Sequence, residues 1–284
     1  MKYVFIKEHS KQFSITLMCQ LFKVSRSGFY AYNTRPLSNQ QRANDELDKK
    51  ITAIFNHHKK RYRAPRITRV LQSQKEPCSH TRVARRMKQM GLMAVAKKKF
   101  KVTTDSDHHL PVYNNVLNRD FPTTAINQKW ACDITYIRTQ EGWLYLAVVI
   151  DLYSRAVIGW SMNQRMKKSL VCDALMMALF KRKFPKQVIV HSDRGSQYCS
   201  NKYQTLLKDY RLMGSMSRKG NCWDNAIAES FFHTLKVELI HQCIYTNREQ
   251  ARQSIFQYLE VYYNKNRMHS AIDYRTPFEF EWVA

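Results

Sequence analysis

Apolar residues in the first part of the chain recur at helical spacing. Ile15, Met18 and Leu21 fall on one side of a helix, and Ser25 is a suitable N-cap for a second short helix directly after it. Two short helices joined by a tight turn are typical of a helix-turn-helix, although any small amphipathic pair has the same pattern. We therefore expect a helix-turn-helix-like region over residues 1–40.

The helical period continues through residues 41–95. We expect one helix over 45–58, a second that begins at Pro65, and a third that Ser79 caps and Gly91 ends. The pattern predicts a second small, all-helical module.

Beyond this module the pattern changes twice. Residues 96–124 show no sustained period and collect Thr, Asp, Asn and Pro, which predicts a linker. Strand patterns follow, and they alternate with helical ones towards the end. Strands are expected at 129–139, 143–151, 155–162, 187–193 and 212–217, and helices at 167–182, 201–211 and 225–241. Residues 125–284 should thus form an α/β fold, with a mixed five-stranded sheet, flanking helices and a helical tail.

The charge of the chain points to a polyanionic partner. Its 47 Lys and Arg against 22 Asp and Glu give a net charge of +25, and nucleic acid is the first candidate. Between Lys49 and Lys101 there are 17 basic residues and one acid, Glu76. Because no acids intersperse the basic residues of the third helix, we expect a phosphate-binding surface made by Arg82, Arg85, Arg86 and Lys88.

Several classes of protein are excluded by pattern. No apolar run approaches the roughly 18 residues of a membrane span, and the amino terminus lacks the apolar region of a signal peptide. The seven cysteines include no Cys-x-x-Cys pair, which argues against both a disulfide framework and a zinc knuckle. We expect a cytoplasmic protein without a membrane partner.

Three aspartates lie where strands would project them towards a common sheet edge. Asp133 lies within the first strand, where an ionised carboxylate is costly unless it is paired or binds a metal. Asp193 ends the fourth strand, where α/β sheets gather their ligands. Asp151 precedes a turn sequence, so we assign it to a hairpin and regard it as a control.

A helix adds a third candidate carboxylate. Asn225, Glu229, His233 and Lys236 follow one another at steps of four, four and three, and so share one helical face. Each acid alone has an ordinary structural explanation, but their joint placement in a basic chain favours a site. Three oxygen donors without His or Cys select Mg²⁺, or Mn²⁺ in its place, and two such ions can drive in-line phosphoryl transfer.

Basic and aromatic residues flank these acids. Arg194, Arg218 and Lys219 are candidates for holding DNA phosphates, although ordinary surface charge explains them as well. Trp223 is expected to pack under its loop rather than to stack on a base. Gly195 should allow a tight turn or a close approach of DNA.

The motifs WACDITY, HSDRGSQY and NCWDNAIAESFFHTLKVE resemble the DDE core of bacterial insertion-sequence transposases. They leave 35 residues between Asp193 and Glu229, and Lys236 lies seven residues further on. The ending YYNKNRMHSAIDYRTPFEFE and the segment APRITRVLQSQ are also similar to this group. The chain thus looks like the OrfB type of insertion-sequence family three, within the retroviral-integrase superfamily.

This resemblance implies an RNase H-like fold and Mg²⁺-dependent DNA strand transfer at terminal inverted repeats. It implies catalytic, metal-binding roles for Asp133, Asp193 and Glu229, and a contact of Lys236 with DNA near the cleaved phosphate. It also implies a nucleoid-associated bacterial enzyme that acts with, or fused to, the product of an upstream reading frame. One departure is Arg63 after Tyr62, where similar proteins usually have glycine.

Other functions stay open at this stage. An RNase H-like nuclease that cuts without joining, or a non-catalytic DNA-binding regulator, would fit the charge and the helices. A tyrosine recombinase is suggested only by Arg267 and His269, which lack partner arginines. Joining two DNA ends predicts a homodimer or higher oligomer on DNA, and no coiled-coil heptad specifies one.

Overall fold

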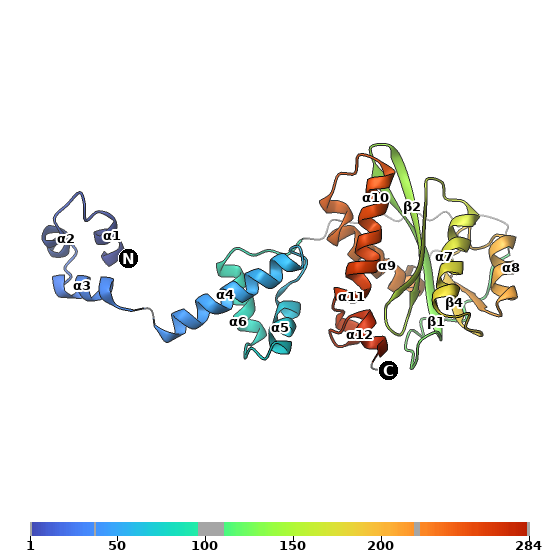
Figure 1. The fold of residues 1–284 in the computed structure, drawn as a ribbon, viewed down its shortest axis with the longest axis horizontal. Coiled ribbons are helices and arrows are strands. Elements are labelled where there is room, and N and C mark those ends of the chain that lie inside the picture. The colour runs from blue at the N-terminus through green and yellow to red at the C-terminus, as the bar shows by residue number, and fades with distance from the viewer. Residues whose placement is uncertain (1, 37, 96–110, 219–221, 283–284) are drawn as a thin grey trace. The chain divides into compact units, whose positions relative to one another are not determined.

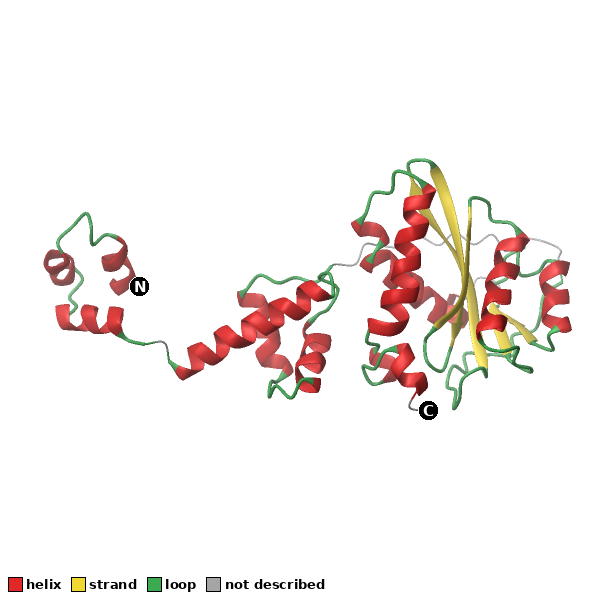
Figure 2. Ribbon diagram, viewed as in Figure 1, coloured by secondary structure: helices red, strands yellow, loops and turns green. Residues whose placement is uncertain are grey.

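The chain folds into two compact units, Met1–Met93 and Ala94–Ala284, in the computed structural model. The structure describes residues 2–36, 38–95, 111–218 and 222–282. Within these ranges the strands all belong to the second unit (Figure 2). None of the described helices combines the length and the apolar character that crossing a membrane requires.

Three short helices open the first unit, namely α1 (Lys2–Glu8), α2 (Ile15–Leu21) and α3 (Arg26–Thr34). They share a small core of Ile6, Met18, Cys19 and Phe29. The predicted cap of α3 is confirmed, because Ser25 Oγ accepts a hydrogen bond from Gly28 N at 3.0 Å. Helix α1 was not predicted from the pattern.

Three further helices follow, α4 (Asn39–His57), α5 (Ala64–Ser73) and α6 (His80–Gln89). Helix α4 begins six residues before the predicted position, because Ser38 Oγ caps it by accepting from Gln41 N at 3.1 Å. Ser79 caps α6 as expected. The buried side chains of this group include Ile51, Ile67, Leu71, Val83 and Met87.

The second unit is built on a mixed five-stranded sheet of order β3-β2-β1-β4-β5, as the sequence predicts. Its strands are β1 (Lys129–Thr139), β2 (Gly142–Asp151), β3 (Val157–Asn163), β4 (Ile189–Ser192) and β5 (Met213–Met216). The first three form an antiparallel meander, and β4 and β5 run parallel to β1.

Helices cover both faces of this sheet (Figure 1). Helices α7 (Lys168–Lys181) and α8 (Asn201–Asp209) pack on the face that contains Trp130 and Cys132 of β1. Helices α9 (Ala226–Glu238) and α10 (Arg248–Phe256) pack on the face that contains Ala131. The alternation of side chains along β1 therefore assigns each residue of the strand to one helical layer.

The carboxyl-terminal part is helical and continues α10. A π-helix, η3 (Gln257–Tyr263), joins α10 to α11 (Asn264–Asn266), and α12 (Pro277–Trp282) follows later. Short 3-10 turns occur at η1 (Cys222–Asn225), η2 (Ile240–Gln242) and η4 (Ser270–Ile272). The helix predicted to end at residue 241 ends at Glu238, and η2 replaces its last turn.

A buried ion pair fixes the end of α9 to the tail. Arg267 donates from Nε and Nη2 to the carboxylate of Glu238 at 2.8 to 3.1 Å, and Tyr258 donates its hydroxyl to the same group at 2.8 Å. Both charged side chains are more than 90% buried. Removing one partner would leave the other charge without compensation in a medium of low dielectric constant.

We therefore expect Arg267→Ala to lower the free energy of unfolding of the second unit by about 3 to 5 kcal/mol. Urea denaturation followed by tryptophan fluorescence measures this unit selectively, because all five tryptophans lie beyond residue 129. The control is Glu249→Gln, which removes an exposed pair with Arg252 and should cost less than about 1 kcal/mol. Equal costs for the two variants would contradict the expectation.

Candidate active site

Two neighbouring parallel strands place Asp133 and Asp193 side by side. In the pairing of β1 with β4, Lys129 lies opposite Ile189 and Ala131 opposite His191. Continued by two residues, this register sets Asp133 level with Asp193. Because side chains alternate along a strand, both aspartates lie on the face of the sheet that α9 covers.

Helix α9 carries Glu229 and Lys236, and the charges of both act on the pKa of Asp133. Burial raises the pKa of Asp133 well above its ordinary value, and the charges of Asp193 and Glu229 raise it further, whereas Lys236 opposes this. Burial and Asp193 likewise raise the pKa of Glu229. The three carboxylates and the lysine therefore form one electrostatic cluster.

The two aspartates are held by the backbone next to them. Asp133 Oδ1 accepts from Ile134 N at 2.7 Å, and Asp193 Oδ1 accepts from Gly195 N at 2.9 Å. Gly195 has an ordinary negative φ, so a tight left-handed turn does not explain it. A Cβ at this position would lie 3.0 Å from Asp193 Oδ1 and 3.2 Å from Gln197 Oε1. The glycine therefore makes room for the Asp193 carboxylate.

Lys236 approaches the cluster from the last turn of α9. Its Nζ lies 5.1 Å from the centre of the Tyr136 ring, a cation-π geometry. Burial lowers the pKa of Lys236, and the charge of Asp133 counteracts this. The lysine is thus the basic group whose charge acts directly on Asp133.

The ligand chemistry of these carboxylates matches the preference of a hard divalent cation for oxygen donors. They supply oxygen donors only, and the charge of Asp193 disfavours ionisation of both its neighbours, a cost that a bound cation would relieve. Over the described ranges, no three His, Cys, Asp or Glu side chains come close enough together to hold an ion. Glu229 is exposed, whereas the two aspartates are half-buried, so its side chain is the one with room to move.

Two further polar residues lie beside the cluster, Asn225, which the sequence places on one helical face with Glu229, and Asp224, which the sequence pattern does not single out. Both are buried, and they directly precede α9. Asn225 Nδ2 donates to the carbonyl of Cys132 at 3.1 Å, and so ties the start of α9 to the strand just before Asp133. Asp224 accepts hydrogen bonds from Arg119 and Arg218. Asp224 gave no period or strand signal, and its partners are remote in sequence.

The basic residues predicted to hold DNA phosphates next to the cluster differ from one another in their contacts. Arg194 Nε donates to the carbonyl of Ser217 at 2.7 Å, and Arg218 binds Asp224, with half of its side chain exposed. Lys219 lies outside the described residues, as does the side chain of Trp223. Their contacts with DNA stay predictions.

The four basic residues of α6 divide into two pairs. Arg82 donates to Asn44 Oδ1 at 3.0 Å, and Arg86 Nε donates to Asp48 Oδ1 at 2.8 Å, so both are tied to α4. Arg85 and Lys88 are exposed. The helix therefore offers the side chains of Arg85 and Lys88 to solvent, although the sequence pattern suggested that all four residues are exposed.

Burial bears on two residues that the sequence left open, Asp151 with its assignment to a hairpin and Arg267 with the tyrosine-recombinase hypothesis. Asp151 is fully buried and accepts from Asn127 N and Tyr153 N at 2.9 Å each, in agreement with its assignment to the turn after β2. Arg267 is occupied by the buried pair with Glu238. This pairing explains Arg267 without recombinase chemistry.

Comparison with known proteins finds matches along most of the chain. Models described as integrase core domain match residues 123–222 and 210–277, and a model described as HTH-like domain matches 42–100. The transposase InsF of insertion sequence IS3A from Escherichia coli is 51% identical over 283 residues, covering 99% of this chain and 98% of the relative. A 31 kDa protein of insertion element IS600 from Shigella sonnei is 41% identical, covering 93% of this chain and 97% of the relative.

Among solved structures, the catalytic core domain of HTLV-2 integrase in complex with magnesium superposes with a TM-score of 0.44. It is 15% identical in sequence, and the match covers 56% of this chain and 99% of that one.

The sheet and the matched domains define a transposase of the integrase-core class that carries an HTH-like domain. The chain shares 51% sequence identity with InsF over nearly its whole length, which shows that it belongs to the IS3 family of insertion-sequence transposases. The resemblance seen in the sequence motifs is thereby confirmed, and the chain is an enzyme of DNA transposition.

We expect Gly195→Ala to lower the frequency of transposition by about tenfold, because the added Cβ displaces the Asp193 carboxylate by a few tenths of an ångström. The frequency with which the element moves to a target plasmid is the measurement. Ser196→Ala, at the exposed neighbouring position, is the control and should have no effect. A normal frequency for Gly195→Ala would show that the carboxylate shifts without consequence.

Proposed function

We propose that this chain cleaves DNA at the terminal inverted repeats of its insertion sequence and joins these ends to target DNA, with Asp133, Asp193 and Glu229 as the catalytic triad. The observation that supports this most is the parallel pairing of β1 with β4, which, continued by two residues, sets Asp133 level with Asp193, with Glu229 within electrostatic reach. The net charge of +25 suits a polyanionic substrate better than any neutral one.

The three carboxylates would hold Mg²⁺, or Mn²⁺ in its place, with two ions at each site. When bound, such ions activate an attacking water or 3′-hydroxyl and stabilise the leaving oxygen of a phosphodiester. The residues of the chain supply the positioning. Asp133 and Asp193 are oriented by backbone amides, and Glu229 approaches from α9.

Lys236 would bind the phosphate next to the cleaved bond. Its side chain is half-buried, stands over Tyr136 and lies near Asp133, so it is held beside the reacting groups. A lysine in this position neutralises charge on the DNA backbone without reading the bases.

The remaining parts of the chain would bind and position DNA. We assign residues 1–40 to a helix-turn-helix-like region, 41–95 to a basic helical module, 96–124 to a linker whose later part packs on the sheet, and 125–284 to the catalytic core. Phosphate contacts are assigned first to Arg85 and Lys88, the exposed pair on α6, with Arg82 and Arg86 beside them, and to Arg194, Arg218 and Lys219 near the triad. In this scheme the partners are the two ends of the element and the target duplex.

Joining two ends requires a homodimer or a higher oligomer on DNA, which acts alone, with the upstream-frame product, or as a fusion to it. We place this assembly in the bacterial cytoplasm, on the nucleoid. A nuclease without joining activity and a non-catalytic regulator are the alternatives that an assay must exclude.

We expect Asp133→Asn, Asp193→Asn and Glu229→Gln each to reduce strand transfer at least about a hundredfold, because each removes one of the charges that hold the cation. The assay uses Mg²⁺, a labelled duplex that ends in the terminal repeat, and a target plasmid. Joined product would support the proposal, cleavage without joining would favour the nuclease, and binding without chemistry would favour the regulator.

The matched control is Asp209→Asn, since Asp209 is an exposed acid at the end of α8. It should retain full activity. Asp151→Asn tests a different effect, because this buried carboxylate accepts two backbone amides and lies 3.8 Å from Arg182 Nη2. Asp151→Asn should lower the free energy of unfolding, and it should have little effect on the rate of strand transfer per folded molecule.

Replacement of Arg85 and Lys88 together by glutamine should weaken binding to duplex DNA of any sequence. If both side chains contact phosphates, the slope of log affinity against log salt concentration should become shallower by roughly two. Fluorescence anisotropy over a range of salt concentrations measures this slope. Lys208→Gln, on α8, is the control, and an unchanged slope in the double variant would exclude these contacts.

A further inference from the structure

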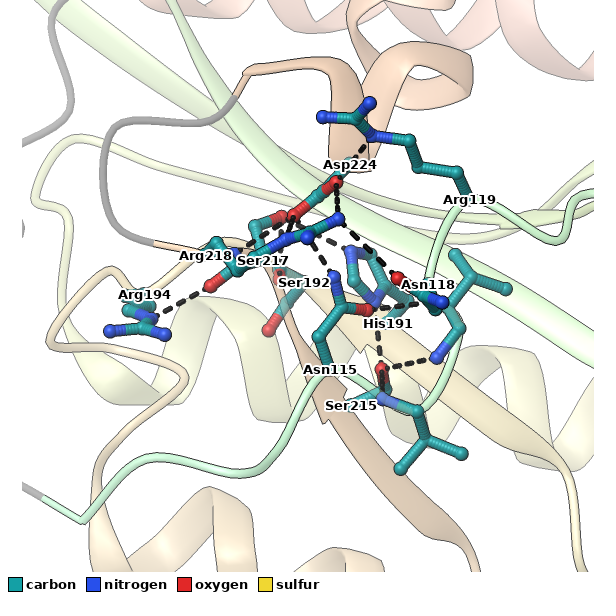
Figure 3. A network of polar contacts seen from close by, with 12 residues as sticks. Asn115, Asn118, Arg119, His191, Ser192, Arg194, Ser215, Ser217, Arg218 and Asp224 are labelled. Atoms are coloured by element: carbon teal, nitrogen blue, oxygen red, sulfur yellow. Dashed lines mark hydrogen bonds and ion pairs between the residues drawn. The ribbon is translucent and has the colours of Figure 1, made fainter.

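A buried carboxylate outside the triad lies at the start of the helix that carries Glu229. Asp224 belongs to η1 and is fully buried, five residues before Glu229. Figure 3 shows it at the centre of a network of polar contacts whose members come from distant parts of the chain. An acid in such a position is costly unless every lone pair is satisfied, so its retention needs an explanation.

The donors to Asp224 come from two segments. Arg119 Nε donates to Oδ1 and Asn115 Nδ2 donates to Oδ2, at 2.9 Å each. Arg218 donates to Oδ2 from its backbone N at 3.0 Å and from its Nε at 3.1 Å. Burial works against the charged form, but the hydrogen bonds from Arg218 and Arg119 hold the pKa of Asp224 well below its usual range. The carboxylate therefore favours its ionised form, and its oxygens are occupied by these donors rather than available as ligands.

The segment that supplies Asn115 and Arg119 is itself fixed to the sheet. Val116 N and Leu117 N both donate to Ser215 Oγ of β5 at 3.0 Å. Ser215 Oγ also lies 2.9 Å from Nδ1 of the buried His191 in β4 (Figure 3). Burial lowers the pKa of His191 to about 4, so the ring is neutral near pH 7. Residues 111–121, which we call the strap, thus connect Asp224 to the strand that leads to Asp193.

The residue after Asp224 fixes the same helix from the other side. Asn225 does not cap α9 with its side chain, and instead donates to the carbonyl of Cys132, the residue before Asp133. The start of α9 is consequently held to β1 through Asn225 and to the strap through Asp224. Glu229, in the first turn of α9, takes its position from these two anchors.

We propose that Asp224 is a positioning residue for strand transfer, which sets the place of Glu229 relative to Asp133 and Asp193 by binding the start of α9 to Arg119 and Arg218. This inference rests on the proposed function of the triad. The strap contacts the start of α9 through Arg119, which is charged, and through Asn115, which is neutral.

The positioning role of Asp224 can be measured through the affinity of the site for Mn²⁺. If Asp224 places Glu229, then Asp224→Asn should weaken Mn²⁺ binding by about tenfold, the size of effect known for groups that orient metal ligands. The full-length chain is titrated with Mn²⁺ without DNA, and free Mn²⁺ is followed by electron paramagnetic resonance. The Mn²⁺ concentration at half-maximal strand transfer should rise by the same factor, while affinity for the terminal repeat stays within twofold.

A purely structural role predicts a different result. Loss of folded molecules lowers the maximal rate and the number of Mn²⁺ sites, but leaves both midpoints unchanged. Unchanged midpoints in Asp224→Asn would therefore overturn the inference. Asp209→Asn is the matched control, and circular dichroism compares the folded fractions.

A second variant covers the case in which Asp224→Asn fails to fold. Arg119→Gln removes one charged donor from a side chain that is 45% exposed, and leaves Arg218 on Asp224. It should shift both midpoints in the same direction by a smaller factor of about three, whereas Arg211→Gln, an exposed control, should not. Unchanged midpoints in Arg119→Gln would also count against the inference.

The test separates this inference from the proposed function. Wild-type strand transfer that needs metal and is lost in Asp193→Asn supports the triad whatever Asp224 does. Wild-type protein without metal-dependent chemistry would overturn both.

Discussion

Repulsion between the carboxylates of the candidate active site is the constraint on which the rest of the second unit depends. The register of β1 and β4 sets Asp133 level with Asp193 on one face, and Glu229 adds a third negative charge from α9. Such an arrangement is unfavourable in a folded core, since burial and like charge both favour the neutral acids. The groups that oppose it include the backbone amides next to the two aspartates and the charge of Lys236. The fold must hold these groups together by contacts made elsewhere.

Those contacts lie at the two ends of α9. At its start, Asp224 and Asn225 are buried and hydrogen-bonded to the strap and to β1. At its end, Glu238 is buried against Arg267 and Tyr258 of the tail. The apolar face of the helix packs on the sheet between these points, through residues such as Phe231 and Leu235. Apolar packing is tolerant of small sliding, whereas hydrogen-bonded charges are directional, so the polar anchors define where Glu229 and Lys236 stand.

Most of the architecture is predictable from the sequence, because periodicity is a local property. The five strands, α7 to α9 and the caps at Ser25 and Ser79 all follow from patterns within about ten residues. The boundaries that were wrong also have local causes, such as the cap at Ser38 that extends α4. Motif spacing was enough to identify the family, which the identity to the InsF proteins confirms.

The sequence alone determined the order of elements, the excess of positive charge and the three acids on strands and a helix. It did not determine which polar groups meet, because hydrogen bonds between segments about a hundred residues apart leave no periodic trace. Asp224 and Arg119 are such a pair, separated by 105 positions and joined at 2.9 Å. The inward ties of Arg82 and Arg86 to α4 are another case, since their helix shows the same run of basic residues whichever side is buried. Only packing in three dimensions decides which charged side chains are exposed to solvent and which ones form hydrogen bonds that position the candidate active site.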